Sequence, residues 1–261
     1  MSPEEYTSQS ISDSLVTTVV GRKLFVHQTL TSTMDEALKL ARAGAEDGTV
    51  VIADTQTAGK GRFQRRWLSE HRASILVSVI LKPTADELPN LNMGISLAIL
   101  RAVRRYPGVR GTIKWPNDIN VNDLKLCGTL LDSYFDKSKL DFAIVGIGLN
   151  VNLDVSKYPD IAKIATSLSM ATGAQVSRLK VLHCLLEELD VNYREVRQNV
   201  SFFSEWRGCI STIGQQVNVT SAGHTLSGVA EGVNEQGELL MRATDGILHN
   251  LNSGEVSLHT S

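Results

Sequence analysis

The sequence predicts an α+β fold, with a mixed domain over residues 23–210 and a small all-β unit over residues 211–261. Two observations support this prediction. Up to Gly208, apolar runs typical of buried strands alternate with apolar residues at helical spacing. Beyond Gly208, short apolar segments are separated by polar turns, as in a small β-sandwich or β-barrel. Residues 1–22 are rich in Ser, Thr and acidic residues, and we expect a loose or peripheral lead-in there.

The first predicted helix follows a short strand at residues 24–26. Its apolar face consists of Met34, Ala37, Leu38 and Ala41. Ser32 and Thr33 precede this face, acidic residues follow as in a capping box, and Gly44 marks the end of the helix. Amide donors and the helix dipole at such an N-terminus favour an anionic or polar ligand. The same residues also suit an ordinary N-cap, which is the commoner case.

A polar loop between two predicted strands, at residues 49–53 and 74–82, is the most informative part of the chain. Its glycines, cations and aromatic residue are Gly59, Lys60, Gly61, Arg62, Arg65, Arg66 and Trp67. Glycine lets backbone amides approach a ligand, Lys and Arg suit phosphate and carboxylate groups, and tryptophan can stack on a base. A solvated basic loop and contact with a nucleic-acid backbone remain alternatives. The spacing fits neither a Walker loop nor a dinucleotide fingerprint.

The rest of the α+β domain consists of two helices, a hairpin and a long strand. We expect helices at 90–105 and 178–197, hairpin strands at 118–121 and 124–133 around Asn122–Asp123, and a strand at 142–151. Gly146 and Gly148 interrupt the last strand. Glycine within a strand marks either a bulge or the close approach of a ligand.

Charged residues around the hairpin suggest a second part of a ligand site. Asp118 follows a Pro-Asn bend, which would fix a carboxylate able to hold Mg²⁺ on nucleotide phosphates. Strand alternation predicts that Lys125 lies on the same face as Cys127 and Thr129. Gly128 leaves room for a ligand, and Asn150 could donate to a phosphate or ribose.

Composition excludes several classes of protein. The chain has 261 residues, 42% hydrophobic and 21% charged, with 26 Lys plus Arg against 28 Asp plus Glu, so a broad basic field for nucleic acid is absent. The three cysteines form no CxxC pair, which favours reduced thiols in a cytosol. We identify neither a secretory signal nor an apolar run of the roughly 18–20 residues that would span a bilayer.

Five segments, taken in order, resemble the biotin–protein ligase family. They are STMDEA (32–37), QTAGKGRFQRRW (56–67), KWPND (114–118), KLCG (125–128) and GIGLNVN (146–152). The resemblance implies a mixed-sheet catalytic domain related to class II aminoacyl-tRNA synthetases and lipoate ligases, plus a small C-terminal SH3-like β-barrel. It also implies the short type of ligase, without an N-terminal DNA-binding domain.

The resemblance further implies a reaction and a set of functional residues. Members of the family use ATP and Mg²⁺ to join biotin to a lysine of a biotin carboxyl carrier domain, through biotinyl-5′-adenylate. Catalysis would fall to Lys125 and Arg62, and metal binding to Asp118. Biotin binding would fall to Ser32, Thr33, Met34, Gln56, Gly59, Lys60, Gly61, Arg62, Lys125 and Gly128. ATP binding would fall to Arg62, Arg65, Trp67, Lys114, Asn117 and Asn150.

The chain departs from the family pattern at several positions. Lys60 replaces a common arginine, Met34 a frequent asparagine, and Gln64 a usual glycine, while His259 stands where a basic residue is frequent. We expect a cytoplasmic enzyme with no nucleic-acid or membrane partner, and leave a homodimer open. Two other functions stay open as well: ligation of lipoate or another acyl acid on the same fold, and nucleic-acid binding through the loop at 59–67.

Overall fold

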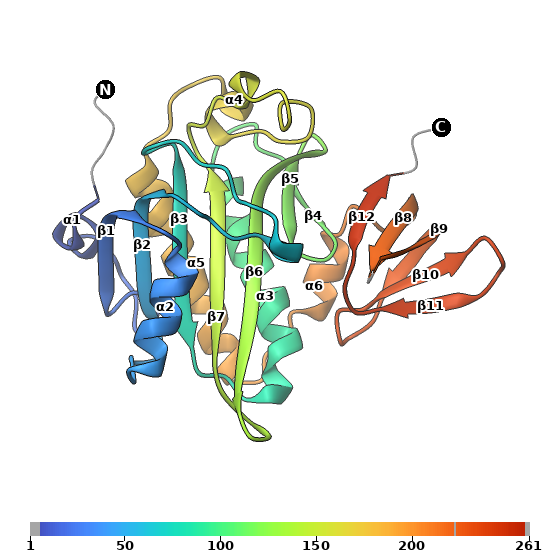
Figure 1. Cartoon of the computed structure of the whole chain (residues 1–261), viewed down its shortest axis with the longest axis horizontal. Helices are drawn as coiled ribbons and strands as arrows, with labels where there is room; N and C mark the ends of the chain where they lie inside the picture. The colour runs from blue at the N-terminus through green and yellow to red at the C-terminus, as the bar shows by residue number, and fades with distance from the viewer. Residues whose placement is uncertain (1–5, 222, 259–261) are drawn as a thin grey trace.

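The computed structural model describes residues 6–221 and 223–258, which form two sheets with helices on both faces of the larger one (Figure 1). The larger sheet has seven strands in the order β1-β2-β3-β7-β6-β5-β4. Their bounds are β1 Leu24–Leu30, β2 Thr49–Gln56, β3 Ser74–Leu81, β4 Gly111–Lys114, β5 Asp118–Val121, β6 Leu124–Asp136 and β7 Lys139–Asn150. Each strand predicted in this domain is present, which confirms the mixed α+β fold.

The sheet is mixed because its first two strands are joined differently from the others. β1 and β2 pair in parallel, with helix α2 (Thr33–Arg42) as the crossover between them. The other neighbours pair antiparallel. All eight residues of β3 are buried, since this strand lies near the middle of the sheet and is covered on both faces.

Helices cover the two faces of the sheet unequally. α2 lies in front of it in Figure 1, whereas α3 (Leu88–Arg104) and α5 (Arg178–Arg197) lie behind it. Met34 and Ala37 of α2 pack on Ile144 and its neighbours in a small front cluster. The larger cluster behind the sheet contains most of the buried apolar residues and extends into the C-terminal strands. The shorter helices are α1 Ser8–Ser12, η1 Arg62–Gln64, η2 Ala85–Glu87, η3 Val155–Lys157, α4 Leu168–Thr172 and α6 Phe203–Gly208.

The segment before β1 is not a loose lead-in, so the sequence-based expectation is wrong for residues 6–22. Tyr6, Ile11 and Val20 are almost fully buried and belong to the main apolar cluster. The carboxylate of Asp190 in α5 accepts hydrogen bonds from the backbone N–H groups of residues 18–20. A few apolar residues and one buried acceptor therefore fasten this polar stretch to α5.

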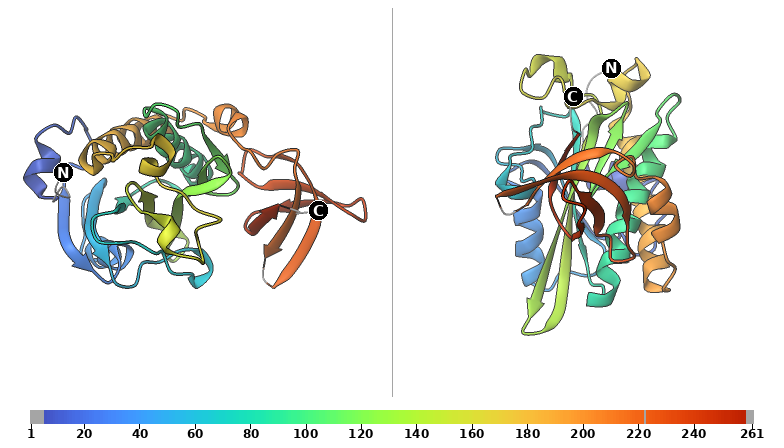
Figure 2. Two further views of the ribbon diagram at one scale, coloured as in Figure 1. Left: turned by 90° about the horizontal axis from the view of Figure 1, so that it is seen from above. Right: turned by 90° about the vertical axis from the view of Figure 1, so that its right-hand side faces the viewer.

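The C-terminal strands form a separate antiparallel sheet beside the larger one (Figure 2). Its order is β11-β10-β9-β8-β12, with β8 Gln216–Ser221, β9 His224–Val233, β10 Leu239–Ala243, β11 Leu248–Leu251 and β12 Glu255–Leu258. This confirms the small SH3-like unit, although in the described part of the chain no pairing of β11 with β12 closes a barrel. β11 was not predicted from the sequence, and His259 lies outside the described residues.

Trp115 joins the two sheets. Its backbone N–H donates to Thr212 Oγ1 at 3.0 Å, and its indole Nε1–H donates to the carbonyl of Gly237 at 2.8 Å. The backbone of Ile113 also pairs with the segment that leads into the C-terminal unit. Among the described residues, no helix has both the length and the apolar character required to cross a bilayer.

Candidate active site

A cavity of about 290 Å³ opens where the two sheets meet. Its wall combines parts of the chain that are far apart in sequence. Five of these are the start of α2 with Gln56, the loop at 60–68, the segment 114–118, residues of β6 and β7, and residues 254–256 of the C-terminal unit; residues between 153 and 165 complete the wall. Most of the residues that the sequence predicted as ligand contacts therefore line one pocket.

The start of α2 presents fixed polar groups to this pocket. Ser32 is the N-cap, and its hydroxyl accepts from the N–H of Met34 at 3.3 Å. Gln56 Oε1 accepts from both the N–H and the hydroxyl of Thr33, at 2.6 and 3.0 Å. Ser78 in β3 donates to the same hydroxyl of Thr33 at 2.8 Å. Because Thr33, Gln56 and Ser78 are hydrogen-bonded to one another and are buried or half-buried, this polar end of the pocket is held rigidly.

Glycines form the floor of the pocket because side chains from elsewhere occupy the space above them. A Cβ on Gly148 would lie 2.4 Å from Trp67 Cε2, and one on Gly146 would lie 2.7 Å from the sulfur of Met34. A Cβ on Gly128 would lie 3.0 Å from the end of the Lys125 side chain. The glycine interruptions thus mark close approach of side chains from the loop and from α2, together with space for a ligand.

Lys125 faces the pocket for a reason that strand alternation did not predict. The β5–β6 register shifts so that Ile119 pairs with Cys127 while Asn120 pairs with Lys125, which leaves Leu126 as an extra residue. A bulge of this kind reverses the alternation. The expectation that Lys125 shares the face of Cys127 is therefore wrong, because the end of its side chain lies over Gly128 instead.

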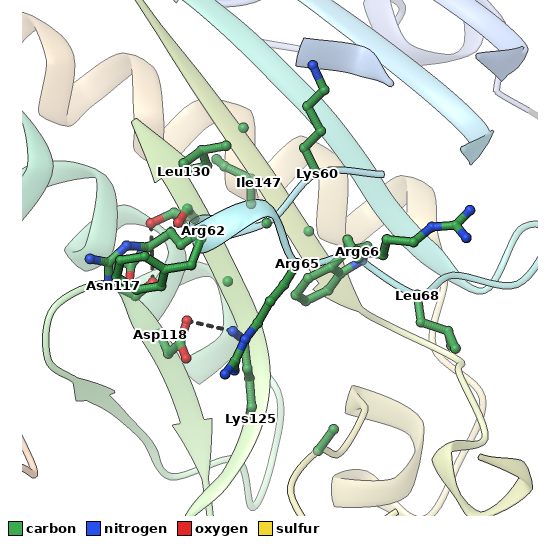
Figure 3. A pocket seen from close by; sticks show the side chains of 18 of the residues that line it. Lys60, Arg62, Arg65, Arg66, Leu68, Asn117, Asp118, Lys125, Leu130 and Ile147 are labelled. Carbon is green, nitrogen blue, oxygen red and sulfur yellow. Dashed lines mark hydrogen bonds and ion pairs between the residues drawn. The ribbon is translucent and has the colours of Figure 1, made fainter. Parts of the chain in front are cut away.

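One carboxylate and one aromatic ring lie beside the Lys125 ammonium. Its Nζ lies 2.8 Å from Asp118 Oδ1 and 5.6 Å from the centre of the Trp67 ring (Figure 3). Its backbone is held as well, since its N–H donates to the carbonyl of Ile164 and its carbonyl accepts from Thr166, both at 2.9 Å. Both the ammonium and the backbone of Lys125 are thus held in place, while about a third of its side chain stays accessible.

Arg62 reaches the same pocket from the loop. Its Nη1 donates to Asn117 Oδ1 and to the carbonyl of Gly254, both at 3.2 Å. Burial lowers the pKa of the guanidinium from its usual value, against the opposing charges of Asp118 and Glu255. Guanidinium is a strong enough base to remain cationic under these conditions. The site therefore holds a largely desolvated cation near a second one, Lys125.

Other predicted residues are present but do not all point inward. Lys60 pairs with Asp35 on α2, and in Figure 3 its side chain points away from the Lys125–Asp118 pair. Arg65 forms an ion pair with Glu255 at 2.5 Å. Asn150 is buried, and its Nδ2 donates to the carbonyl of Thr166 at 3.1 Å. Gly59 and Gly61 shape the loop backbone, and Lys114 lines the cavity near Asn117.

Two parts of the wall were missed by sequence reasoning. Leu153, Ile161, Ile164 and Ala165 form an apolar side of the cavity, and Gly254–Val256 come from the C-terminal unit. No local pattern in residues 153–165 distinguishes this segment from an ordinary loop. No role was predicted from the sequence for Gly254–Val256.

The donors near Asp118 suit a magnesium ion that is shared with a ligand. Asp118 and Asn117 provide hard oxygen atoms at the pocket wall. Within residues 6–221 and 223–258, no group of three His, Cys, Asp or Glu side chains could form an all-protein metal site. Mg²⁺ is commonly held by one or two carboxylates plus substrate phosphates, so a single carboxylate fits this ion.

Comparison with known proteins places this fold. The profile of the Biotin/lipoate A/B protein ligase family matches residues 25–150, and that of the Biotin protein ligase C terminal domain matches residues 212–259. The two sheets thus correspond to the two parts of one class of protein, the acyl-acid ligases that carry this C-terminal unit.

Individual relatives narrow the class. The bifunctional ligase/repressor BirA of Bacillus subtilis is 33% identical over 250 residues, covering 94% of this chain and 77% of that protein. The biotin--[acetyl-CoA-carboxylase] ligase of Mycobacterium tuberculosis is 32% identical over 244 residues, covering 89% and 88%. A biotin protein ligase from Aquifex aeolicus, solved in complex with biotin and ATP, has a TM-score of 0.76 and 29% identity, covering 92% of this chain and 100% of that one. The chain belongs to the biotin protein ligase family.

Proposed function

We propose that this chain activates biotin with ATP and transfers it, through biotinyl-5′-adenylate, to a lysine of a biotin carboxyl carrier domain. The single observation that carries the proposal is that Arg62 and Lys125 both line one pocket, held there by the adjacent residues Asn117 and Asp118. Membership of the biotin protein ligase family supports the choice of biotin as the acid.

The first step joins two anions, and the two cations make that feasible. The biotin carboxylate attacks the α-phosphorus of ATP, a new P–O bond forms, and pyrophosphate leaves with the bridging oxygen. Lys125 and Arg62 offset the repulsion between carboxylate and phosphate and stabilise the charge of the transition state. Asp118 orients the Lys125 ammonium, at 2.8 Å.

The second step needs the adenylate to be protected until an acceptor arrives. The lysine amine of the carrier attacks the acyl carbon, the C–O bond to phosphate breaks, and AMP leaves with both electrons. Water would attack the same carbon. The loop at 60–68 covers the pocket and excludes water from the adenylate, and Trp67 lies on the glycine floor.

The assignments for substrate binding follow the geometry of the wall. We assign biotin to the apolar floor and the polar slot formed by Ser32, Thr33 and Gln56. The nucleotide takes the side formed by Arg62, Asn117 and the C-terminal unit. Mg²⁺ would be held by Asp118 together with phosphate oxygens, and when bound it would neutralise charge on the departing pyrophosphate.

The remaining parts of the proposal concern partners and place in the cell. Free thiols at Cys127, Cys184 and Cys209 suit a reducing cytoplasm, where ATP is also present. A carrier domain is the acceptor that the biotin ligase reaction requires. β1 is an edge strand of the large sheet and offers a route to a homodimer.

Adenylate capture tests the proposal directly. The protein is incubated with biotin and ATP-Mg²⁺, desalted, and analysed by native mass spectrometry. A complex heavier by the mass of biotinyl-adenylate is expected, with lipoate giving none in a parallel incubation. Capture of a lipoyl-adenylate instead would identify lipoate, and not biotin, as the acid that the enzyme activates. Absence of any adenylate would refute the ligase assignment.

A further inference from the structure

The loop at 57–73, which lies over the pocket, is braced internally. The N–H of Gly61 donates to the carbonyl of Arg65 at 2.8 Å. The N–H of Trp67 donates to the carbonyl of Gly59 at 2.9 Å. Because these bonds close within the loop, it would move as one piece. Its position over the pocket then depends on its side-chain contacts with α2, Asn117 and the C-terminal unit, and on how its ends leave β2 and enter β3.

One carboxylate, that of Asp54 near the end of β2, holds both ends of the loop. Arg72 Nε donates to Asp54 Oδ2 at 3.1 Å, and the Arg72 N–H donates to the Asp54 carbonyl at 3.2 Å. Arg178 Nη2 donates to Asp54 Oδ1 at 2.6 Å. Arg178 Nε donates to the carbonyl of Ser74, the first residue of β3, at 3.2 Å. The cluster therefore ties both strand ends to the first turn of α5.

This cluster is buried, which makes its hydrogen bonds strong and its geometry strict. Asp54 and Arg178 are 1% and 2% exposed. The Tyr6 ring lies 4.1 Å from the Arg178 guanidinium carbon and covers its face. Arg72 adopts a φ of 56°, a left-handed conformation that a non-glycine residue keeps only where its surroundings impose it.

We propose that Asp54, Arg72 and Arg178, the loop-base clamp, are positioning residues that hold the loop at 57–73 closed over the adenylate. None of the three lines the described cavity, so they act through the loop rather than on substrate. The identity of the ligand in this inference, the adenylate, rests on the proposed function. The clamp itself is a property of the free protein and can be tested without ligand.

Limited proteolysis of the ligand-free protein is the first test. We expect trypsin to cleave after Lys60, Arg62, Arg65 and Arg66 faster when the loop opens. Arg72→Ala removes the side-chain hydrogen bond to the Asp54 carboxylate and keeps the backbone N–H bond to the Asp54 carbonyl, and Arg72 is the most exposed member of the clamp. We expect cleavage within residues 60–66 to accelerate about tenfold, the effect of losing one charged hydrogen bond. Arg72→Lys should restore much of the protection.

Retention of the adenylate is the second test. Preloaded protein is desalted, and release of labelled biotinyl-adenylate is followed with time. Arg72→Ala should release it about tenfold faster, while the maximal rate of biotin-dependent pyrophosphate exchange changes less than about twofold. Equal retention and equal cleavage in Arg72→Ala and the wild type would overturn the inference. A wild-type protein that forms no adenylate would refute the proposed function. The proteolysis of the ligand-free protein would still show whether the clamp holds the loop closed.

Matched variants separate the clamp from general stability. Arg101→Ala removes an ion pair with Glu205 of 2.6 Å, remote from the loop, and should change neither cleavage nor release. Tyr6→Leu keeps an apolar cover over Arg178 but removes its aromatic face, and should accelerate cleavage about threefold. If Arg72→Ala does not fold, Tyr6→Leu provides the test. A rate of loop cleavage in Tyr6→Leu equal to that of the wild type would contradict the proposed clamp.

Discussion

The Lys125 ammonium lies 2.8 Å from the Asp118 carboxylate, an ion pair between the two strands of one hairpin. A bulge at Leu126 turns Lys125 toward the pocket, and Asp118 then holds the ammonium above the glycine floor. The pair is partly accessible, so its contribution to stability is small. In the proposed reaction, the pair would place a positive charge where carboxylate and phosphate meet.

Under the proposed function, removing either Lys125 or Arg62 should impair adenylate formation. Lys125→Ala and Arg62→Ala should each lower it by on the order of 10²-fold, as is typical when one charge-stabilising group is lost. Biotin-dependent pyrophosphate exchange measures this step alone. Lys39→Ala, which removes an exposed lysine that pairs with Glu36, is the control. Wild-type exchange rates in both cation variants would show that the site is assigned incorrectly.

A methyl group on the pocket floor should displace the loop tryptophan. In Gly148→Ala the new Cβ would lie 2.4 Å from Trp67 Cε2, so the indole must move. Trp115 and Trp206 are buried, and a red shift of fluorescence would therefore report Trp67. Biotin affinity should fall at least about tenfold as the floor is lost.

The matched control for this floor substitution is Gly208→Ala. A Cβ there meets no atom of the described structure within 4 Å, and the backbone is not left-handed. This variant should keep the wild-type spectrum and biotin affinity. An unshifted spectrum in Gly148→Ala would mean that Trp67 does not rest on the floor in solution.

Attachment of the N-terminal segment should make stability depend on pH. Burial acts to raise the pKa of Asp190, but hydrogen bonds from the N–H groups of residues 18–20 and the charge of Arg194 outweigh it, so the net pKa is lowered. A lowered pKa gives stability that is present above the unfolded value, about 4, and is lost as pH falls through the folded value.

Asp190→Asn tests this linkage. The variant keeps one acceptor oxygen but loses the charge, so we expect about 1–3 kcal/mol less stability at pH 7. Urea unfolding from pH 7 to pH 3 should show the gap between variant and wild type narrowing below about pH 4. A constant gap across that range would contradict a charged Asp190 as the anchor.

Sequence patterns were sufficient where structure is local. The helix at 178–197 has the predicted bounds, because apolar spacing is combined with a serine N-cap at its start. Asn122 and Asp123 form the hairpin turn with φ values of 51° and 63°, which these residue types tolerate. The glycines of β6 and β7 indicated close approach, and the structure shows side chains packed there.

Patterns failed where tertiary contacts decide. Alternation placed Lys125 on the wrong face, because the bulge at Leu126 depends on pairing with β5. Ile11 reads as an isolated apolar residue in a polar stretch, yet it is fully buried. The contact of Arg62 with the carbonyl of Gly254 joins residues 192 positions apart, a distance at which no local signal operates.

The join between the two sheets should be the most sensitive structural point near the site. Trp115→Phe leaves the carbonyl of Gly237 without its 2.8 Å partner and opens a small cavity, at a cost of about 2–3 kcal/mol. Asn117 and Asp118 follow directly, so adenylate formation should fall as well.

Trp206→Phe is the matched control: it removes the same atoms from an equally buried indole whose Nε1 has no hydrogen-bond partner in the described structure. Thermal unfolding should show Trp115→Phe to be less stable than Trp206→Phe by about 1 kcal/mol, the value of one hydrogen bond. Equal losses would mean that packing alone, and not the bond to Gly237, fastens the C-terminal unit to the site.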